Sequence, residues 1–125
     1  MNKIKVLLVV LLAAVAGLTT GAASAQHETI QFRVKSNYAY QVQLSFYSQD
    51  RNIVWPGGGR AYTLNDSNVH TYNLTCVGGE RICYGAWVTG NANKYWGVGY
   101  QNKQRCSNCC WVCNGPVSPL QVNLN

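Results

Sequence analysis

Apolar and polar residues alternate with a period of two through much of this chain. Residues 29–35 (TIQFRVK) and 40–47 (YQVQLSFY) each place apolar side chains at every second position, with polar side chains between them. The predicted inner-face residues are Ile30, Phe32 and Val34 in the first segment, and Tyr40, Val42, Leu44 and Phe46 in the second. This period predicts β-strands with one buried face and one face in water.

Further strands are predicted at 61–64, 69–76, 81–88, 94–100 and 120–124, each bounded by glycine, proline, asparagine or aspartate. About seven short strands at spacings of roughly ten residues are typical of all-β domains. The pattern therefore predicts a small antiparallel β-sandwich, or a partly open barrel. The segment WPGGGR, residues 55–60, is expected to form a turn.

The first 25 residues have the pattern of a secretory signal peptide. They begin with two lysines, continue with the apolar run Val6–Leu18 and end in alanines at 23 and 25, before Gln26. The run is about 13 residues long, whereas a membrane-spanning helix needs roughly 20. We expect residues 1–25 to be removed on export, in the manner of a bacterial signal. Residues 26–125 would then be one secreted or periplasmic domain without a membrane span.

Six cysteines follow this segment, and disulfides are their expected state in an exported chain. They are Cys76, Cys83, Cys106, Cys109, Cys110 and Cys113. A tight turn at Gly79 would pair residues 69–76 with 81–88 as a hairpin and place Cys76 opposite Cys83. Either these two cysteines bridge each other, or each bridges one of the other four cysteines, here called the C-terminal quartet. In the second case the two remaining members of the quartet bridge each other. We favour the second arrangement because it ties the C-terminal segment to the central hairpin.

The quartet has the spacing i, i+3, i+4 and i+7, which falls on one stripe of a helix. A short cysteine-rich helical turn is therefore expected near the C-terminus. Four thiolates could also hold zinc or copper(I), but the adjacent Cys109 and Cys110 would crowd a tetrahedral ion. Redox exchange would be expected within a thioredoxin-like βαβ unit, which the pattern lacks. We expect disulfides, with no bound metal and no cofactor.

Charged residues are few and scattered. The whole chain has 10 lysines and arginines against 4 carboxylates, and two of the lysines lie in the signal segment. This mild positive excess suits anionic cell-surface polymers but is too dispersed to indicate nucleic acid. No paired carboxylates, Ser/His/Asp pattern or phosphate-binding glycine loop is present. The chain is therefore not expected to be an enzyme.

Aromatic residues are the most distinctive feature left, with 4 tryptophans and 8 tyrosines. In residues 94–100 (KYWGVGY), alternation places Trp96, Val98 and Tyr100 on one face, and Tyr95 beside glycines on the other. Glycines next to an exposed ring would leave an open surface for a sugar ring or an apolar partner, although these rings could instead fill the core. The candidate binding surface comprises Trp55, Arg60, Lys94, Tyr95, Trp96 and Tyr100.

Together these features predict an exported, non-catalytic binding or interaction module. Its partner would be an envelope polysaccharide or a secreted protein, contacted through tyrosine, tryptophan and dispersed basic residues. A secreted antimicrobial protein or enzyme inhibitor would share the basic, cystine-rich build and is the first alternative. A thiolate metal-binding or redox protein is the second.

Overall fold

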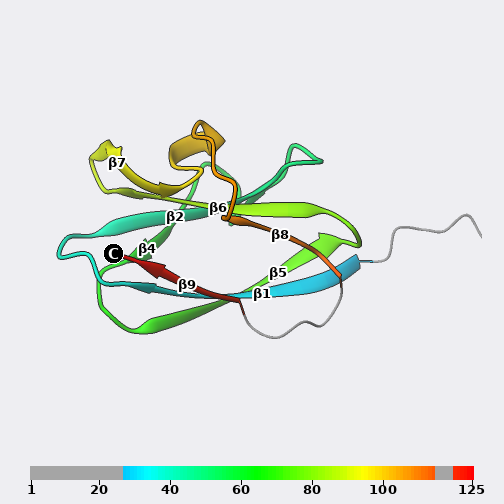
Figure 1. Cartoon of the computed structure of the whole chain (residues 1–125), viewed down its shortest axis with the longest axis horizontal. Helices are drawn as coiled ribbons and strands as arrows, with labels where there is room; N and C mark the ends of the chain where they lie inside the picture. Colours follow the sequence, from blue (N-terminus) through cyan, green and yellow to red (C-terminus); the bar gives the residue numbers. More distant parts are fainter. Residues whose placement is uncertain (1–26, 115–119) are drawn as a thin grey trace, which may run out of the picture.

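A computed structural model describes residues 27–114 and 120–125, and within these ranges the chain is nearly all β (Figure 1). Its elements are β1 (His27–Ser36), β2 (Val42–Ser48), β3 (Val54–Trp55), β4 (Tyr62–Leu64), β5 (Val69–Val77), β6 (Arg81–Val88), β7 (Asn91–Gly97), the 3-10 turn η1 (Tyr100–Asn102), β8 (Cys110–Val112) and β9 (Leu120–Leu124). The predicted signal peptide, residues 1–25, lies outside the described residues. None of the described residues belongs to a helix long and apolar enough to cross a membrane.

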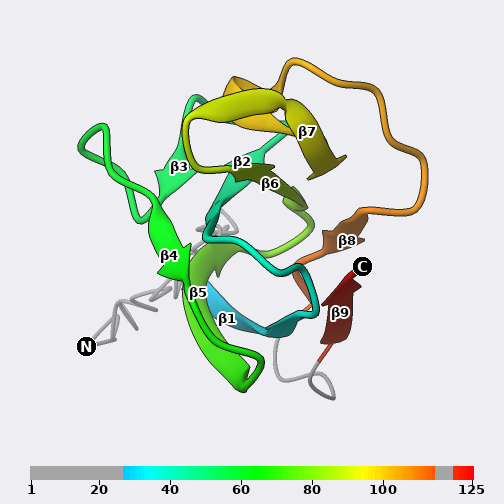
Figure 2. The same ribbon diagram turned by 90° about the vertical axis from the view of Figure 1, so that its left-hand side faces the viewer.

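The strands form two sheets packed face to face, so the predicted β-sandwich is confirmed. One sheet has the order β5-β1-β9, and the other has the order β3-β2-β6-β7, with β4 also pairing with β2 and β8 with β6. Figures 1 and 2 show the small sheet on one side and the large sheet on the other. Strand β9 runs parallel to β1, with Val34 opposite Val122, so the sandwich is not wholly antiparallel.

The main core lies between the two sheets and follows the predicted alternation. Its fully buried residues include Ile30, Phe32 and Val34 from β1, and Val42, Leu44 and Phe46 from β2. Phe32 and Phe46 meet across the sandwich with ring centroids 4.6 Å apart. Tyr40 is the exception to the predicted face, because it lies before β2 begins and is 70% exposed.

A second, smaller core lies on the outer face of the large sheet. Residues 98–110, here called the covering segment, leave β7 and pass over this face before joining β8. Val98 and Cys109 of this segment pack with Tyr47 and Cys83 of the sheet in a buried cluster. Strand β2 is consequently buried on both faces, and even Ser45, at a predicted solvent-facing position, is covered.

Residues 69–76 and 81–88 do not form the hairpin expected from the sequence. Their strands, β5 and β6, belong to different sheets, and the turn at Gly79 carries the chain from one layer to the other. The turn itself is tight, because the Glu80 amide donates to the Val77 carbonyl at 2.9 Å. Placing β6 in the opposite layer lets Leu74 and Ile82 face the common core from opposite sides.

Residues 94–100 are not one alternating strand either. Strand β7 ends at Gly97, whose φ of 61° breaks the alternation, and Gly99 has a φ of 63°. Val98 therefore turns into the second core, and Tyr100 lies exposed in η1. The glycines do not make a flat surface: a Cβ on Gly97 would collide with the Tyr84 carbonyl, and one on Gly99 would meet Gln104 and Tyr95.

The cysteine-rich segment forms bends through residues 107–109 and then strand β8. These bends are consistent with a cysteine-rich turn, but described residues 106–113 include no helix, and Cys110 already belongs to a strand. Cys76 bridges Cys113, Cys83 bridges Cys110, and Cys106 bridges Cys109. The favoured arrangement, with two long links and one local pair, is thus the one found.

Candidate ligand-binding cleft

An open cleft of about 660 Å³ lies where the β3–β4 connection faces the covering segment. One wall consists of residues 51–54 and 57–61, and the other of Trp87 with residues 100–102 of η1. Ser45, Tyr47 and Ser48 of β2 line the space between the walls. Its volume is within the range of small-molecule binding sites, which is about 300–1,000 Å³.

The aromatic wall is built from two distant segments. Trp87 is on the outer face of β6 and is 9% exposed, whereas Tyr100 in the covering segment is 40% exposed. Their ring centroids are 5.0 Å apart in an edge-to-face arrangement, which aromatic pairs favour. The buried Trp87 thus supports Tyr100, which presents its ring to solvent.

The backbone next to Tyr100 is held in an uncommon conformation. Gln101 and Asn102 have φ values of 57° and 59°, in the left-handed region that residues other than glycine rarely occupy. The Gln101 amide donates to the Tyr47 hydroxyl at 3.0 Å, and Asn102 exchanges side-chain hydrogen bonds with Gln49. Burial raises the pKa of the Tyr47 hydroxyl, so it stays neutral. Strained backbone of this kind is concentrated at binding sites.

The two arginines of the cleft have different surroundings. Arg51 forms a two-pronged ion pair with Glu80, in which Nη2 donates to Oε1 at 2.8 Å and Nε donates to Oε2. Arg60 is exposed, and the ion pairs found among the described residues do not include it. Among the residues that the structure describes, no carboxylate lines the cleft. Its local charge is therefore positive and comes mainly from Arg60.

Glu80 is a structural carboxylate, as its hydrogen bonds show. It is 3% exposed and also accepts from the Ser48 hydroxyl at 2.6 Å and the Val77 amide at 3.0 Å. The Arg51 guanidinium is the main cause that lowers the Glu80 pKa to about 2. These contacts join the β5–β6 turn to the loop after β2, and so fix one wall of the cleft.

This pKa predicts how stability depends on pH. Because the folded pKa lies below the ordinary value of 4.5, Glu80 stabilises the fold above pH 4.5, and the contribution disappears as pH falls towards 2. We expect Glu80→Gln to lower the free energy of unfolding by about 3 kcal/mol at pH 7. Urea unfolding at pH 7, 5, 4 and 3 would measure the difference from wild type, which should shrink at each step below pH 5. A difference that is constant over this range would contradict the prediction.

The sequence-predicted surface residues fall in separate places. Arg60 and Tyr100 line the cleft on opposite walls. Trp55 is partly buried against the main core, and Tyr95 is exposed on β7 opposite Trp87. The sequence therefore identified two cleft residues but not the cleft.

Lys94 and Trp96 lie in a second aromatic group. The Lys94 ammonium is 5.6 Å from the Tyr38 ring centroid and 5.5 Å from that of Trp96. Tyr38 also packs edge-on against Trp96 and Tyr40. Trp96 is half-buried, and its indole N–H donates to the Asn125 carbonyl at 3.0 Å, so it fastens the C-terminus as well as contributing to this group.

Sequence reasoning missed Trp87, Gln101 and Asn102 as members of the cleft. Trp87 occupies an ordinary position in an alternating strand, and its partner is thirteen residues further along the chain. The only local signal was the concentration of glycines around residues 97–99, which marks a departure from regular strand.

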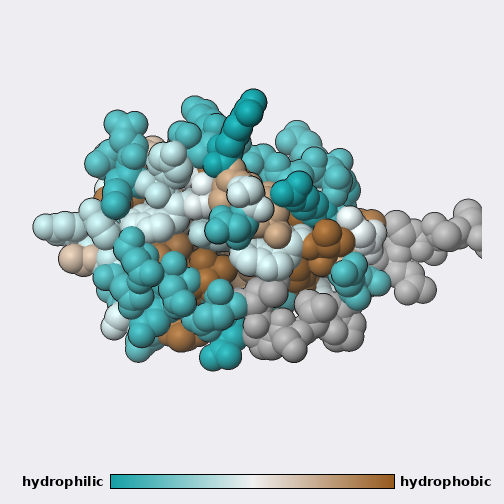
Figure 3. Space-filling model, viewed as in Figure 1, coloured by the Kyte–Doolittle hydropathy of each residue, from teal (hydrophilic) through white to brown (hydrophobic). Residues whose placement is uncertain are grey.

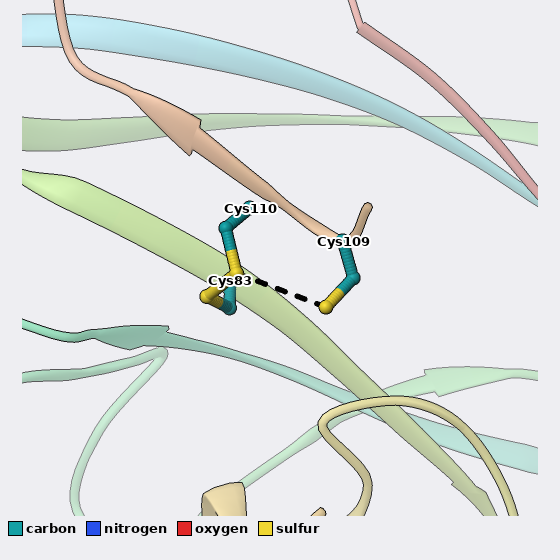
Figure 4. A group of neighbouring side chains, drawn as sticks. All are labelled: Cys83, Cys109 and Cys110. Atoms are coloured by element: carbon teal, nitrogen blue, oxygen red, sulfur yellow. Dashed lines mark hydrogen bonds between the residues drawn. A yellow bond between two sulfur atoms is a disulfide. The ribbon is translucent and has the colours of Figure 1, made fainter. Parts of the chain in front are cut away.

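The cysteines that could have formed a metal centre are oxidised. The sulfurs of Cys83, Cys109 and Cys110 lie within 4.8 Å of one another (Figure 4). The Sγ atoms of Cys109 and Cys110 are 3.7 Å apart, a packing contact because disulfide sulfurs carry no hydrogen. All six cysteines are bridged. In this state they offer no thiolate, the ligand on which the metal alternative depends.

Apolar surface is divided into small areas on the face drawn in Figure 3. Hydrophilic side chains cover most of that view, and apolar ones lie between them in limited patches. Among the described residues in this view, a large apolar docking patch is therefore not seen.

Comparison of the chain with protein families, characterised proteins and solved structures finds no match.

Proposed function

We propose that the protein is exported by bacteria as a non-catalytic binding module, and that its cleft holds a glycan of the cell envelope. The observation that carries the proposal is the combination, in one cleft, of an exposed Tyr100 ring with amide side chains. The three disulfides are consistent with an oxidising location outside the cytoplasm.

The cleft offers the two kinds of contact that a sugar needs. The C–H face of a sugar ring packs against an aromatic ring, and Tyr100 presents one that is held edge-on by Trp87. Sugar hydroxyls both donate and accept hydrogen bonds, as does the side-chain amide of Asn52. The amides of Gln101 and Asn102 already bond to Tyr100 and Gln49, and each keeps one further N–H to donate. Apolar packing with a few polar groups is the usual composition of such sites.

Non-catalytic binding is favoured over hydrolysis by the residues of the cleft. Glycoside hydrolysis ordinarily uses a pair of carboxyl groups beside the scissile bond. The cleft has none among its lining residues, and Glu80 behind it is occupied by Arg51, Ser48 and a backbone amide. A polysaccharide bound here would therefore leave with its chain length unchanged.

The test is to replace the exposed ring. We expect Tyr100→Ala to weaken binding to envelope polysaccharide by at least about tenfold, because the variant loses the stacking surface. Binding would be measured by co-sedimentation and calorimetry with purified polysaccharides, and polymer length would be followed to detect cleavage. Tyr40→Ala is the matched control, since Tyr40 is exposed but lies outside the cleft.

Two results would contradict the proposal. One is that no polysaccharide binds while a protein partner is captured, which would favour the interaction or inhibitor alternative. The other is that Tyr100→Ala binds polysaccharide as tightly as the Tyr40→Ala control and the wild type do. Circular dichroism would verify that both variants keep the wild-type fold.

A further inference from the structure

The tip of the β3–β4 connection, residues 57–60, exposes backbone to the cleft. Gly57, Gly58 and Gly59 have φ values of 86°, 65° and 71°, a left-handed conformation that glycine adopts without steric cost. A Cβ at Gly58 or Gly59 would meet no atom within 4 Å. A ligand can therefore approach the main chain directly at these two positions.

Two backbone amides at this tip are free to donate to a ligand. The Arg60 amide donates to the Gly57 carbonyl at 3.2 Å and closes the tip, which fixes the residues between them. The amides of Gly58 and Gly59 donate to no backbone carbonyl of the described residues. Successive free backbone amides in a turn make a concave site that attracts anions.

The adjacent side chain supplies a full positive charge. The guanidinium of Arg60 has no carboxylate partner among the described residues, unlike that of Arg51, which Glu80 neutralises. Lys103, whose Nζ lies over the Tyr100 ring at 5.7 Å from the centroid, is not among the residues that line the cleft. The cleft thus combines the aromatic ring of Tyr100 with the unpaired cation of Arg60, and its described lining residues include no carboxylate.

We infer that the ligand is an anionic glycan, whose carboxylate, sulfate or phosphate binds the Gly58–Arg60 tip while its sugar ring packs on Tyr100. Arginine suits this role because its planar fork binds the two oxygens of such a group at once. The inference depends on the proposed function and adds the charge class of the ligand and the residues that read it.

The experiment compares polymers that differ only in charge. Polygalacturonate and its methyl ester share a backbone, as do dextran sulfate and dextran, and the two pairs separate carboxylate from sulfate. We expect wild-type protein to bind a charged polymer at least about tenfold more tightly than its uncharged counterpart. Raising NaCl from about 50 mM to about 500 mM should reduce this difference, because salt screens exposed charges.

Arg60→Gln tests whether the discrimination arises at the tip. We expect it to lose most of the preference for the charged polymer while keeping the residual affinity for the uncharged one. Arg33→Gln is the control, because Arg33 is also exposed but lies on β1 in the other sheet. Thermal unfolding of both variants would verify that the fold is unchanged.

The outcomes separate this inference from the proposed function. Equal binding of charged and uncharged polymers, or an Arg60→Gln variant that keeps the preference, overturns the inference and leaves glycan binding intact. An equal loss in Arg60→Gln and Arg33→Gln shows a non-specific attraction of polyanions and also overturns it. Failure to bind any of the four polymers, or purified envelope polysaccharide, overturns the proposed function.

Discussion

Replacing Cys76 and Cys113 together by alanine should lower the free energy of unfolding by at least about 3 kcal/mol. This bridge joins strand β5 of the small sheet to the residue after β8 of the large sheet, and both sulfurs are fully buried in the main core. The cysteines are 37 positions apart. With the Cys83–Cys110 bridge in place, the shortest path between the two cysteines runs along residues 76–83, across that bridge and along residues 110–113. The loop that Cys76–Cys113 closes therefore has about 12 residues, which corresponds to about 3 kcal/mol.

The loss would be large for a domain this small, whose total stability is on the order of 5–10 kcal/mol. Its melting temperature should fall by about 12 °C or more. Alanine substitution of Cys106 and Cys109 is the control, since that bridge spans a separation of only 3. The control should lose about 2 kcal/mol or less. Guanidinium unfolding of both variants measures the difference, and an equal or larger loss in the control would show the explanation to be wrong.

Gly85→Ala should destabilise the protein by about 3 kcal/mol or more, at the upper end of what overpacking costs. Gly85 lies on β6 under the covering segment, and a Cβ there would collide with the Gly99 carbonyl and approach the Tyr47 ring to 2.9 Å. The Gly99 carbonyl belongs to the backbone of the covering segment, so it cannot move away from the new Cβ as a flexible side chain could. We therefore expect the covering segment to be displaced from the sheet.

This displacement has its own readout. Lys103 and Arg105 lie within the covering segment, so trypsin should cleave Gly85→Ala there faster than it cleaves the wild type. Gly78→Ala is the matched control, because its new Cβ would only meet the Glu28 carboxylate at 3.3–3.5 Å, and that side chain can move. The control should stay within about 1 kcal/mol of the wild type. Wild-type stability and trypsin resistance in Gly85→Ala would contradict the packing of residues 98–110 against the sheet.

The alternation of β1 and β2 predicted the part of the main core that these two strands supply. Ile30, Phe32 and Phe46 are buried as the period of two required, because every second side chain of a strand points to the same face. The pairing of the cysteines was narrowed by parity to two arrangements. The sequence favoured the arrangement with two long links, but only the structure identified the partners as Cys76–Cys113, Cys83–Cys110 and Cys106–Cys109.

The covering segment shows where local pattern ceased to be informative. Positive φ at Gly97 and Gly99 ends the alternation that the sequence suggests for residues 94–100. Period-two reasoning assigns a residue to a face but does not say whether a distant segment covers that face. Ser45 is buried for this reason, although its polar side chain predicted exposure.

The candidate site depended on tertiary structure most of all. The cleft brings together a turn, a strand and a 3-10 element, which supply Arg60, Trp87 and Tyr100. The spacing of these residues along the chain does not predict that they meet. What the amino-acid sequence determined by itself was an all-β, disulfide-linked sandwich, since side-chain periodicity and cysteine parity are local or countable properties. Only the folded chain decided which sheet each strand joins and which aromatic rings meet at a cleft, because these depend on burial between segments far apart in the sequence.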